Sequence, residues 1–251
     1  MLESGVKYIN EVFDSPHVAP EQLDLLLADG WRHFGTYFFR YSLGIYEFDI
    51  RLVIPLRIRL AEFSLSKSQR RVLRQNADLS VVVRPAQITA KAVELFDRHK
   101  RRFKSSVPDS IYDFLSEEPA HIPCETMEVS VRVDDRLAAV SYFDIAARSV
   151  SAVYGMFDPE ISERSLGIFT MLKEIEFARE NGKDFYYQGY AYEGESFYDY
   201  KKRFRGTEAF DWNGRWRPLV AKEESSADDP TSGTTNEDLT ADDADKSGSE
   251  V

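Results

Sequence analysis

The sequence predicts an α+β fold in which a mixed β-sheet carries flanking helices and a small N-terminal module precedes it. Hydrophobic residues form 43% of the 251-residue chain and aromatic residues 13%, which is enough for a packed core. From Met127 the hydrophobic residues recur with period two, as in half-buried strands. An amphipathic helical pattern and a further aromatic strand follow, so the later elements can complete the same sheet.

The N-terminal module, residues 1–62, is expected to contain one helix and several aromatic extended segments. PEQLDLLLADG predicts a helix that begins near Pro20 and is closed by Gly30. WRHFGTYFFRYS indicates a strand or loop. DIRLVIPLRIRLAEF indicates extended segments that are interrupted at Pro55.

The main domain is expected at residues 63–221. KSQRRVLRQNAD predicts a helix capped by Ser66, DLSVVVRP a strand that ends at Pro85, and ITAKAVELFDRHKRRFKS a longer helix, with a short one in SIYDFLSE. MEVSVRV, LAAVSYFDI and SVSAVYGMFD predict an antiparallel meander. SERSLGIFTMLKEIEFARENG predicts a helix that ends at Asn181–Gly182. DFYYQGY predicts a strand, SFYDYKKRF a short helix, and TEAFDW with RWRPL a closing hairpin around Asn213–Gly214.

Charge is distributed unevenly along the chain. Residues 222–251 hold ten acidic and two basic residues, so −8 of the formal net charge of −11 lies there. This acidic tail has almost no apolar residues and is expected to be disordered. Residues 51–104 instead hold fourteen Lys and Arg against four Asp and Glu. Such a basic segment indicates either a polyanionic partner such as RNA or a solvated face with no partner.

Several classes of protein find no support in the sequence. No run of eighteen apolar residues is present, and the N-terminus lacks the pattern of a secretory signal, so we expect a cytoplasmic protein without a membrane partner. The single cysteine, Cys124, and four scattered histidines predict neither a disulfide nor a metal site. Cys124 is interpreted as inert rather than nucleophilic.

The order of the predicted elements resembles the GCN5-related acetyltransferase architecture, in which a mixed sheet splits open where the fourth and fifth strands part. Within that order, five motifs resemble the arginyl-tRNA–protein transferases and their bacterial leucyl-transferring relatives. They are GWRHFGTYFFR, SQRRVLRQNADL, DP followed by RSLG, FYYQGY and YKKRF, and they cover most of residues 30–205. That family carries clustered cysteines in its N-terminal module, and this chain has none there. This departure from the family's pattern implies that the zinc or iron–sulfur site of the family is absent.

The resemblance implies transfer of arginine or leucine from charged tRNA to proteins that begin with Asp or Glu, which marks them for degradation. Aminoacyl-tRNA would be the co-substrate, with no separate cofactor and no DNA partner. The reaction is aminolysis of an ester by an α-amine with a pKa of about 7.7–8.0, so it needs juxtaposition and oxyanion stabilisation more than a strong base. The alternatives are a CoA-dependent N-acyltransferase and a non-catalytic derivative that binds tRNA or protein.

The segment FYYQGYAYEGESFYDYKKRF contains six tyrosines and is the expected lip of the site. The catalytic candidates are Tyr187, Tyr190 and Lys201, since the rings can stack on an adenosine and the lysine can contact a phosphate or oxyanion. Gln188 and Gly189 are candidates for polar substrate contacts. Alternate strand positions are buried, so half of the tyrosines could instead belong to the core.

Two substrate-binding candidates precede this segment. RSLGIF offers Arg164, Ser165 and Gly167 at a helix N-terminus, where backbone amides bind anions. Phe169 should crowd a phosphate there, which argues against CoA. An ordinary helix turn is the alternative. Asp158, before a proline, is a candidate to receive the acceptor amine or simply starts a turn.

Three arginines form the last candidate. SQRRVLRQN places Arg70, Arg71 and Arg74 within two helical turns, and Arg70 and Arg74 share one helix face. Guanidinium groups in this arrangement suit the phosphates of tRNA or an acidic acceptor residue. Structural ion pairs are the alternative interpretation.

Overall fold

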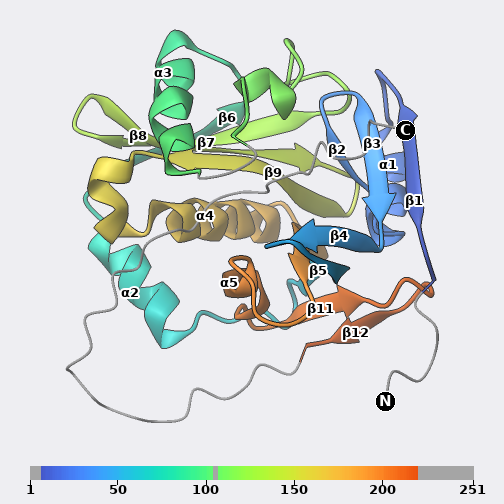
Figure 1. Cartoon of the computed structure of the whole chain (residues 1–251). Helices are drawn as coiled ribbons and strands as arrows, with labels where there is room; N and C mark the ends of the chain where they lie inside the picture. The colour runs from blue at the N-terminus through green and yellow to red at the C-terminus, as the bar shows by residue number, and fades with distance from the viewer. Residues whose placement is uncertain (1–6, 104–106, 220–251) are drawn as a thin grey trace.

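The computed structural model describes residues 7–103 and 107–219 and is organised around a nine-stranded mixed sheet (Figure 1). Its strands are β4 (Leu43–Tyr46), β5 (Asp49–Arg59), β6 (Ser80–Pro85), β7 (Thr126–Val133), β8 (Arg136–Ile145), β9 (Ser149–Phe157), β10 (Phe185–Tyr192), β11 (Thr207–Phe210) and β12 (Trp216–Pro218). They lie in the order β12-β11-β5-β10-β9-β8-β7-β6, and β4 pairs with β5. The predicted α+β class and the predicted β7-β8-β9 meander are confirmed. The predicted acidic tail lies outside the described residues.

Helices cover both faces of this sheet. They are α1 (Pro20–Ala28), α2 (Lys67–Gln75), α3 (Ala90–His99), α4 (Leu166–Glu180) and α5 (Asp199–Lys202). Successive side chains of β8 point to opposite faces of the sheet and so reach different helices. Val140 and Tyr142 pack into the hydrophobic cluster under α3, whereas Ala139 and Phe143 pack into the cluster under α4. Figure 1 shows α3 and α4 on opposite sides of the strands.

In the described part of the chain, no helix combines the length and the apolar character that crossing a membrane would require.

The N-terminal residues form a second sheet and also supply one strand to the large one. β1 (Asn10–Asp14), β3 (Tyr37–Tyr41) and β2 (Arg32–Phe34) pair antiparallel in the order β1-β3-β2. β5 belongs to the expected module at residues 1–62, yet it lies between β10 and β11 in the large sheet. The large sheet thus draws strands from both sides of the expected boundary. The expected division into residues 1–62 and 63–221 stays a prediction.

The α1 helix begins and ends as the sequence predicts. Pro20 is its first residue, and Gly30 follows its end with a φ of +85°. Only glycine adopts that conformation readily. A Cβ atom at Gly30 would also lie 3.1 Å from the ring of Trp212. The chain therefore turns closely against the C-terminal hairpin before it enters β2.

The predicted interruption at Pro55 is wrong, because β5 runs through it without a break. Pro55 faces Tyr190 of β10. On the other side of β5, pairing with β4 ends at Leu52 and pairing with β11 begins at Leu56. Proline lacks an N–H to donate, and here it stands where the strand has no neighbour on that side.

The observed ends of the helices agree better with the capping residues than with the hydrophobic pattern of the sequence. Ser66 caps α2 as predicted, since its hydroxyl accepts the backbone N–H of Gln69 in a capping box. The helix predicted from Ser162 begins only at Leu166, because Ser165 adopts a left-handed φ of +53° after a 3₁₀ turn. The predicted helix in SIYDFLSE is a 3₁₀ turn at Ile111–Asp113. These corrections leave the element order unchanged.

Candidate functional site

The neighbouring strands β9 and β10 separate, and the gap between them is the candidate site. They pair in parallel only where Phe185–Tyr187 face Ser149–Ser151. Further along, β10 stays paired with β5 through a bulge between Tyr187 and Gly189, and β9 stays paired with β8. The facing edges of β9 and β10 therefore have no ladder partner in this stretch. Their backbone polar groups need partners from side chains, water or a ligand.

A cavity of about 50 Å³ lies in this gap. Its polar lining includes Ser141 of β8, Thr170 and Glu174 of α4, Gln188 of β10, and Tyr200 and Lys201 of α5. A space of this size admits a few water molecules or the reacting end of a substrate. The gap thus brings together hydroxyl, carboxyl, amide and ammonium groups from four elements.

Gln188 gives the strongest sign of a ligand. Its side chain is 2% exposed, and neither Oε1 nor Nε2 has a hydrogen-bond partner among the described residues. A buried polar group without a partner costs about 1–3 kcal/mol. Its place at the bulge of β10 lets the amide face the cavity instead of the core. A bound water or substrate group would supply the missing hydrogen bonds.

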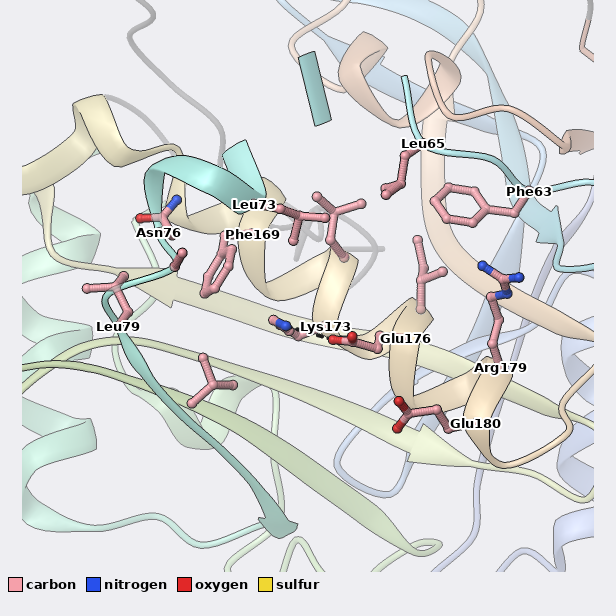
Figure 2. A pocket seen from close by; sticks show the side chains of 14 residues that line it. Phe63, Leu65, Leu73, Asn76, Leu79, Phe169, Lys173, Glu176, Arg179 and Glu180 are labelled. Carbon is pink, nitrogen blue, oxygen red and sulfur yellow. Dashed lines mark hydrogen bonds and ion pairs between the residues drawn. The ribbon is translucent and has the colours of Figure 1, made fainter. Parts of the chain in front are cut away.

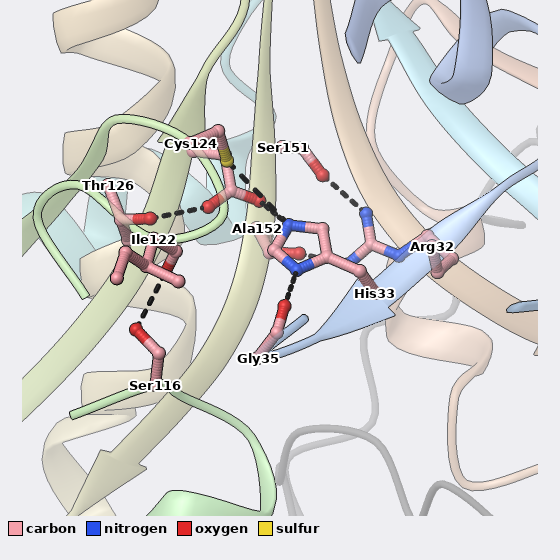
Figure 3. A network of polar contacts seen from close by, with 10 residues as sticks. Arg32, His33, Gly35, Ser116, Ile122, Cys124, Thr126, Ser151 and Ala152 are labelled. Carbon is pink, nitrogen blue, oxygen red and sulfur yellow. Dashed lines mark hydrogen bonds and ion pairs between the residues drawn. The ribbon is translucent and has the colours of Figure 1, made fainter. Parts of the chain in front are cut away.

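Arg32 of β2 reaches the same gap from the N-terminal sheet. Its guanidinium donates to the Ser151 hydroxyl at 2.5 Å and to the backbone carbonyl of Ala152, the first residue of β9 beyond the pairing with β10. Arg32 is buried. It therefore satisfies one carbonyl that the separated strands leave open, and it places a positive charge beside the cavity (Figure 3).

Glu174 places a carboxyl group on the α4 side of the cavity. Burial raises its pKa to about 7, even though the Tyr186 hydroxyl donates to it at 2.6 Å and favours the charged form. The group therefore exchanges its proton near neutral pH. Buried carboxyl groups with this behaviour are suited to accept or return a proton in catalysis.

Lys201 contributes a cation from α5. It is buried, its Nζ donates to the carbonyl oxygen of Tyr190 at 3.1 Å, and it lies 5.0 Å from the centre of the Tyr198 ring. The short helix α5 thus holds the ammonium group against the separated part of β10, which brings it to the rim of the cavity.

Comparisons with known proteins agree with this architecture. Residues 91–211 match the family model "Arginine-tRNA-protein transferase, C terminus". The aspartate/glutamate leucyltransferase of Xanthomonas campestris pv. campestris (strain B100) is 36% identical over 185 residues, which cover 70% of this chain and 73% of that protein. The chain belongs to the arginine-tRNA–protein transferase family.

Two further matches are a relative by sequence and a solved structure. The aspartate/glutamate leucyltransferase of Campylobacter jejuni subsp. jejuni serotype O:6 is 29% identical over 170 residues, which cover 66% of this chain and 70% of that protein. Among solved structures, FemX matches 80% of this chain and 70% of its own with 14% identity and a TM-score of 0.49. As a member of the arginine-tRNA–protein transferase family, the protein is an aminoacyltransferase.

In this transferase the two tyrosine candidates face away from the cavity. The Tyr190 hydroxyl donates to the carbonyl oxygen of Gly30 at 2.6 Å, and its ring packs edge-on against Tyr41 of β3. Tyr187 packs against Trp216 and accepts a hydrogen bond from Arg57. Both rings join the N-terminal residues to β10. Of the residues proposed from this segment, the cavity lining brings together Gln188 and Lys201.

The residues proposed at the start of α4 have mostly structural partners. Arg164 forms an ion pair with Asp78 at 3.0 Å, and Ser165 is the left-handed residue before the helix. Gly167 lines the cavity. Asp158 is buried, caps the 3₁₀ turn through Glu160 N–H, and lies 3.2 Å from Arg136. This geometry favours the alternative, a turn residue, for Asp158.

The expected crowding by Phe169 is not found. Its side chain is 2% exposed and packs in the core under α2, beside Leu73 and Asn76 in the groove between α2 and α4 (Figure 2). It does not stand over the first turn of α4. The argument against CoA that was based on this ring is therefore wrong.

The three α2 arginines are exposed, as a role in binding requires. Arg70 donates to the carbonyl oxygen of Leu65, which leaves most of its guanidinium in solvent. In residues 7–103 and 107–219, no carboxylate pairs with Arg71 or Arg74. The alternative of structural ion pairs thus finds no support. The C-terminus of α2 also contacts the start of α4, because Asn76 donates to the carbonyl oxygen of Arg164.

Sequence reasoning missed Arg32 and Glu174. Glu174 had a detectable signal, because it lies on the buried helical stripe with Leu166, Thr170 and Ala178 at intervals of four residues. A carboxylate on such a stripe is costly unless it has a function or a partner. Arg32 had no local signal, since its partner Ser151 is 119 residues away.

Proposed function

We propose that the protein moves an aminoacyl group, leucine or arginine, from charged tRNA to the α-amine of proteins that begin with Asp or Glu. Family membership and relatives named aspartate/glutamate leucyltransferase support this activity. The observation that carries the location is the buried Gln188 amide in the gap between β9 and β10, which has no hydrogen-bond partner in residues 7–103 and 107–219. The acyl carbonyl group and the attacking amine would meet there.

Four residues at the gap would share the chemistry. The amine nitrogen attacks the ester carbonyl carbon, a C–N bond forms, and the C–O bond to the tRNA ribose breaks. The Gln188 Nε2–H group would donate to the oxyanion, and the positive charges of Lys201 and Arg32 would favour it. The proton released by the amine would pass to Glu174, whose pKa of about 7 suits both uptake and return to the leaving ribose hydroxyl. No cofactor beyond aminoacyl-tRNA takes part in this scheme.

The tRNA would approach along α2. Its exposed arginines Arg70, Arg71 and Arg74 suit the phosphates of the acceptor stem. Asn76 at the end of α2 bonds to the segment directly before α4, and Gly167 in the first turn of α4 lines the cavity. A strand of RNA that lies on α2 would therefore have a short path to the gap. Since charged tRNA is its donor, the proposed place of action is the cytoplasm.

Mass spectrometry of short peptides tests this function. Peptides that begin with Asp, Glu, Arg or Ala are incubated with the full chain and leucyl-tRNA, arginyl-tRNA or acetyl-CoA in separate reactions. The proposal expects one added leucine or arginine on the Asp and Glu peptides alone. Acetylation in the third reaction would instead assign a CoA-dependent enzyme. Absence of any product from folded protein and intact charged tRNA would contradict the proposal.

A further inference from the structure

A second group of polar side chains lies beside Arg32, where β2 meets the large sheet (Figure 3). His33 of β2 points its Nε2 at the Oδ2 atom of Asp144 on β8, 2.8 Å away, and at the Sγ atom of Cys124, 3.9 Å away. One ligand atom from each of the three lies within 4.8 Å of the others. All three residues are at most 5% exposed. The cluster thus holds an imidazole, a thiol and a carboxyl group in one dry place.

Hydrogen bonds with neighbouring groups orient His33 and Asp144 toward the centre of the cluster. The carbonyl oxygen of Gly35 lies 2.9 Å from Nδ1 of His33 and accepts its proton, which leaves Nε2 directed at the cluster. Thr126 Oγ1 donates to Oδ1 of Asp144 at 2.7 Å, which leaves Oδ2 directed at the same point. Histidine ligands of metals characteristically donate their second N–H to a carbonyl, and carboxylate ligands are likewise hydrogen-bonded.

We propose that His33, Cys124 and Asp144 form a binding site for one zinc ion. Imidazole, thiolate and carboxylate are the ligand types that Zn²⁺ takes in proteins. Ligand atoms of tetrahedral zinc lie roughly 3.3–3.6 Å apart at ordinary bond lengths. The separations of His33 from Asp144 and from Cys124, 2.8 and 3.9 Å, lie on either side of that range. All three ligand atoms lie within 4.8 Å of one another, so the ion would draw Cys124 and Asp144 closer together around it.

Charge balance supports a divalent cation. Zn²⁺ with one thiolate, one carboxylate and neutral imidazole is electrically neutral, as a buried site requires.

The site would position Arg32 for the transfer reaction. His33 is the next residue of β2, and the Arg32 side chain reaches Ser151 and Ala152 in the gap. A zinc ion shared by β2, the Cys124 segment and β8 would lock the N-terminal sheet to the large sheet. Zinc therefore has a structural role in this proposal. The test of zinc binding does not depend on which aminoacyl group is transferred.

Metal analysis of the purified full chain is the first test. We expect about one zinc per chain, and the chelator-treated protein should bind Co²⁺ with a thiolate-to-cobalt absorption band. Cys124→Ser should abolish that band and lower metal affinity at least tenfold. This small change leaves the His33–Asp144 pair in place, and circular dichroism verifies the fold. His121→Ala, which removes an exposed histidine, is the matched control and should bind as the unaltered protein does.

Two further measurements need no variant. Zinc added to chelator-treated protein in weak buffer should release protons, because the Cys124 thiol must lose its proton to bind the ion. A hundredfold excess of zinc over its Kd should raise the thermal midpoint by about 5–10 °C. Metal content far below one per chain, with neither a thiolate band nor proton release, would overturn the site. Equal Co²⁺ binding by Cys124→Ser would overturn it as well, and the cluster would then be a buried ion pair with a bystander thiol.

Discussion

At the scale of single residues, burial alone does not separate function from structure in this transferase. Gln188 and Tyr190 lie two positions apart on one strand and are both nearly inaccessible. The Tyr190 hydroxyl has a backbone partner at 2.6 Å, whereas the Gln188 amide has none among the described residues. The first residue therefore stabilises the fold, and the second holds unsatisfied hydrogen-bonding capacity for a ligand.

Substitution of these two residues should have opposite effects. Gln188→Leu removes an oxyanion donor, so kcat/KM for aminoacyl transfer should fall about 100-fold or more, while the free energy of unfolding stays equal or rises. Tyr190→Phe removes the hydrogen bond to Gly30 and should lower the free energy of unfolding by about 1 kcal/mol, with transfer retained. Urea titration and steady-state kinetics measure both. Unaltered turnover in Gln188→Leu would exclude Gln188 from the reaction.

Glu174 predicts a dependence of stability on pH. Its pKa lies near 7 in the folded chain and near 4.5 in the unfolded chain, so between these values the folded chain binds more protons. Its contribution to stability is full below pH 4.5 and is lost as pH rises through 7, by about 3 kcal/mol. Glu174→Gln should remove this part of the pH profile.

The exposed Glu180→Gln on the same helix is the control for this profile. Chemical denaturation of the three proteins at several pH values between 4.5 and 8 gives the comparison. Parallel profiles for all three would mean that Glu174 has an ordinary pKa and is no proton acceptor at neutral pH.

At the scale of elements, capping residues in the sequence were reliable signals, whereas the pairing of strands could not be predicted. Ser66 identified the start of α2, because a capping box is local. The break predicted at Pro55 was wrong, because a strand tolerates proline where it has no neighbour on one side, and this depends on where β4 and β11 end along β5. The late start of α4 follows from the left-handed Ser165. A capping residue can be recognised alone, whereas a strand's neighbours are set by the whole sheet.

The same distinction applies to the site. The segment around FYYQGY located one wall of the gap, but which ring faces the cavity depends on the bulge between Tyr187 and Gly189. Arg32 reaches the gap from the separate small sheet, and no spacing of residues in the sequence predicts this contact. The sequence therefore identified a strand that lines the candidate gap, but Tyr187 and Tyr190 on that strand do not line its cavity.

The α2 helix carries a prediction of its own. If its arginines contact RNA phosphates, Arg71→Ala with Arg74→Ala should reduce the slope of log Kd for tRNA against log salt by about 1.5–2. Lys91→Ala, an exposed cation on α3 across the sheet, should leave the slope unchanged. Filter binding at several salt concentrations measures the slope. An identical slope in the double variant would move the RNA surface away from α2.

At the scale of the whole molecule, two segments far apart in sequence build one sheet and one gap. β5 from the N-terminal half separates β10 from β11, and Arg32 from the small sheet reaches β9. The N-terminal residues are thus part of the site itself. The central claim is that transfer takes place between β9 and β10, on the side of the sheet that α4 covers.

Hydrogen exchange with a stable ligand tests this claim most directly. The ligand is an adenosine that carries leucine or arginine through a 3′-amide in place of the ester, so it binds without reacting. We predict slower exchange in β9 beyond Ser151 and in β10 from Gln188 to Tyr192, and no such protection in Gln188→Leu. Protection confined to the groove between α2 and α4 would place the site elsewhere and contradict the account.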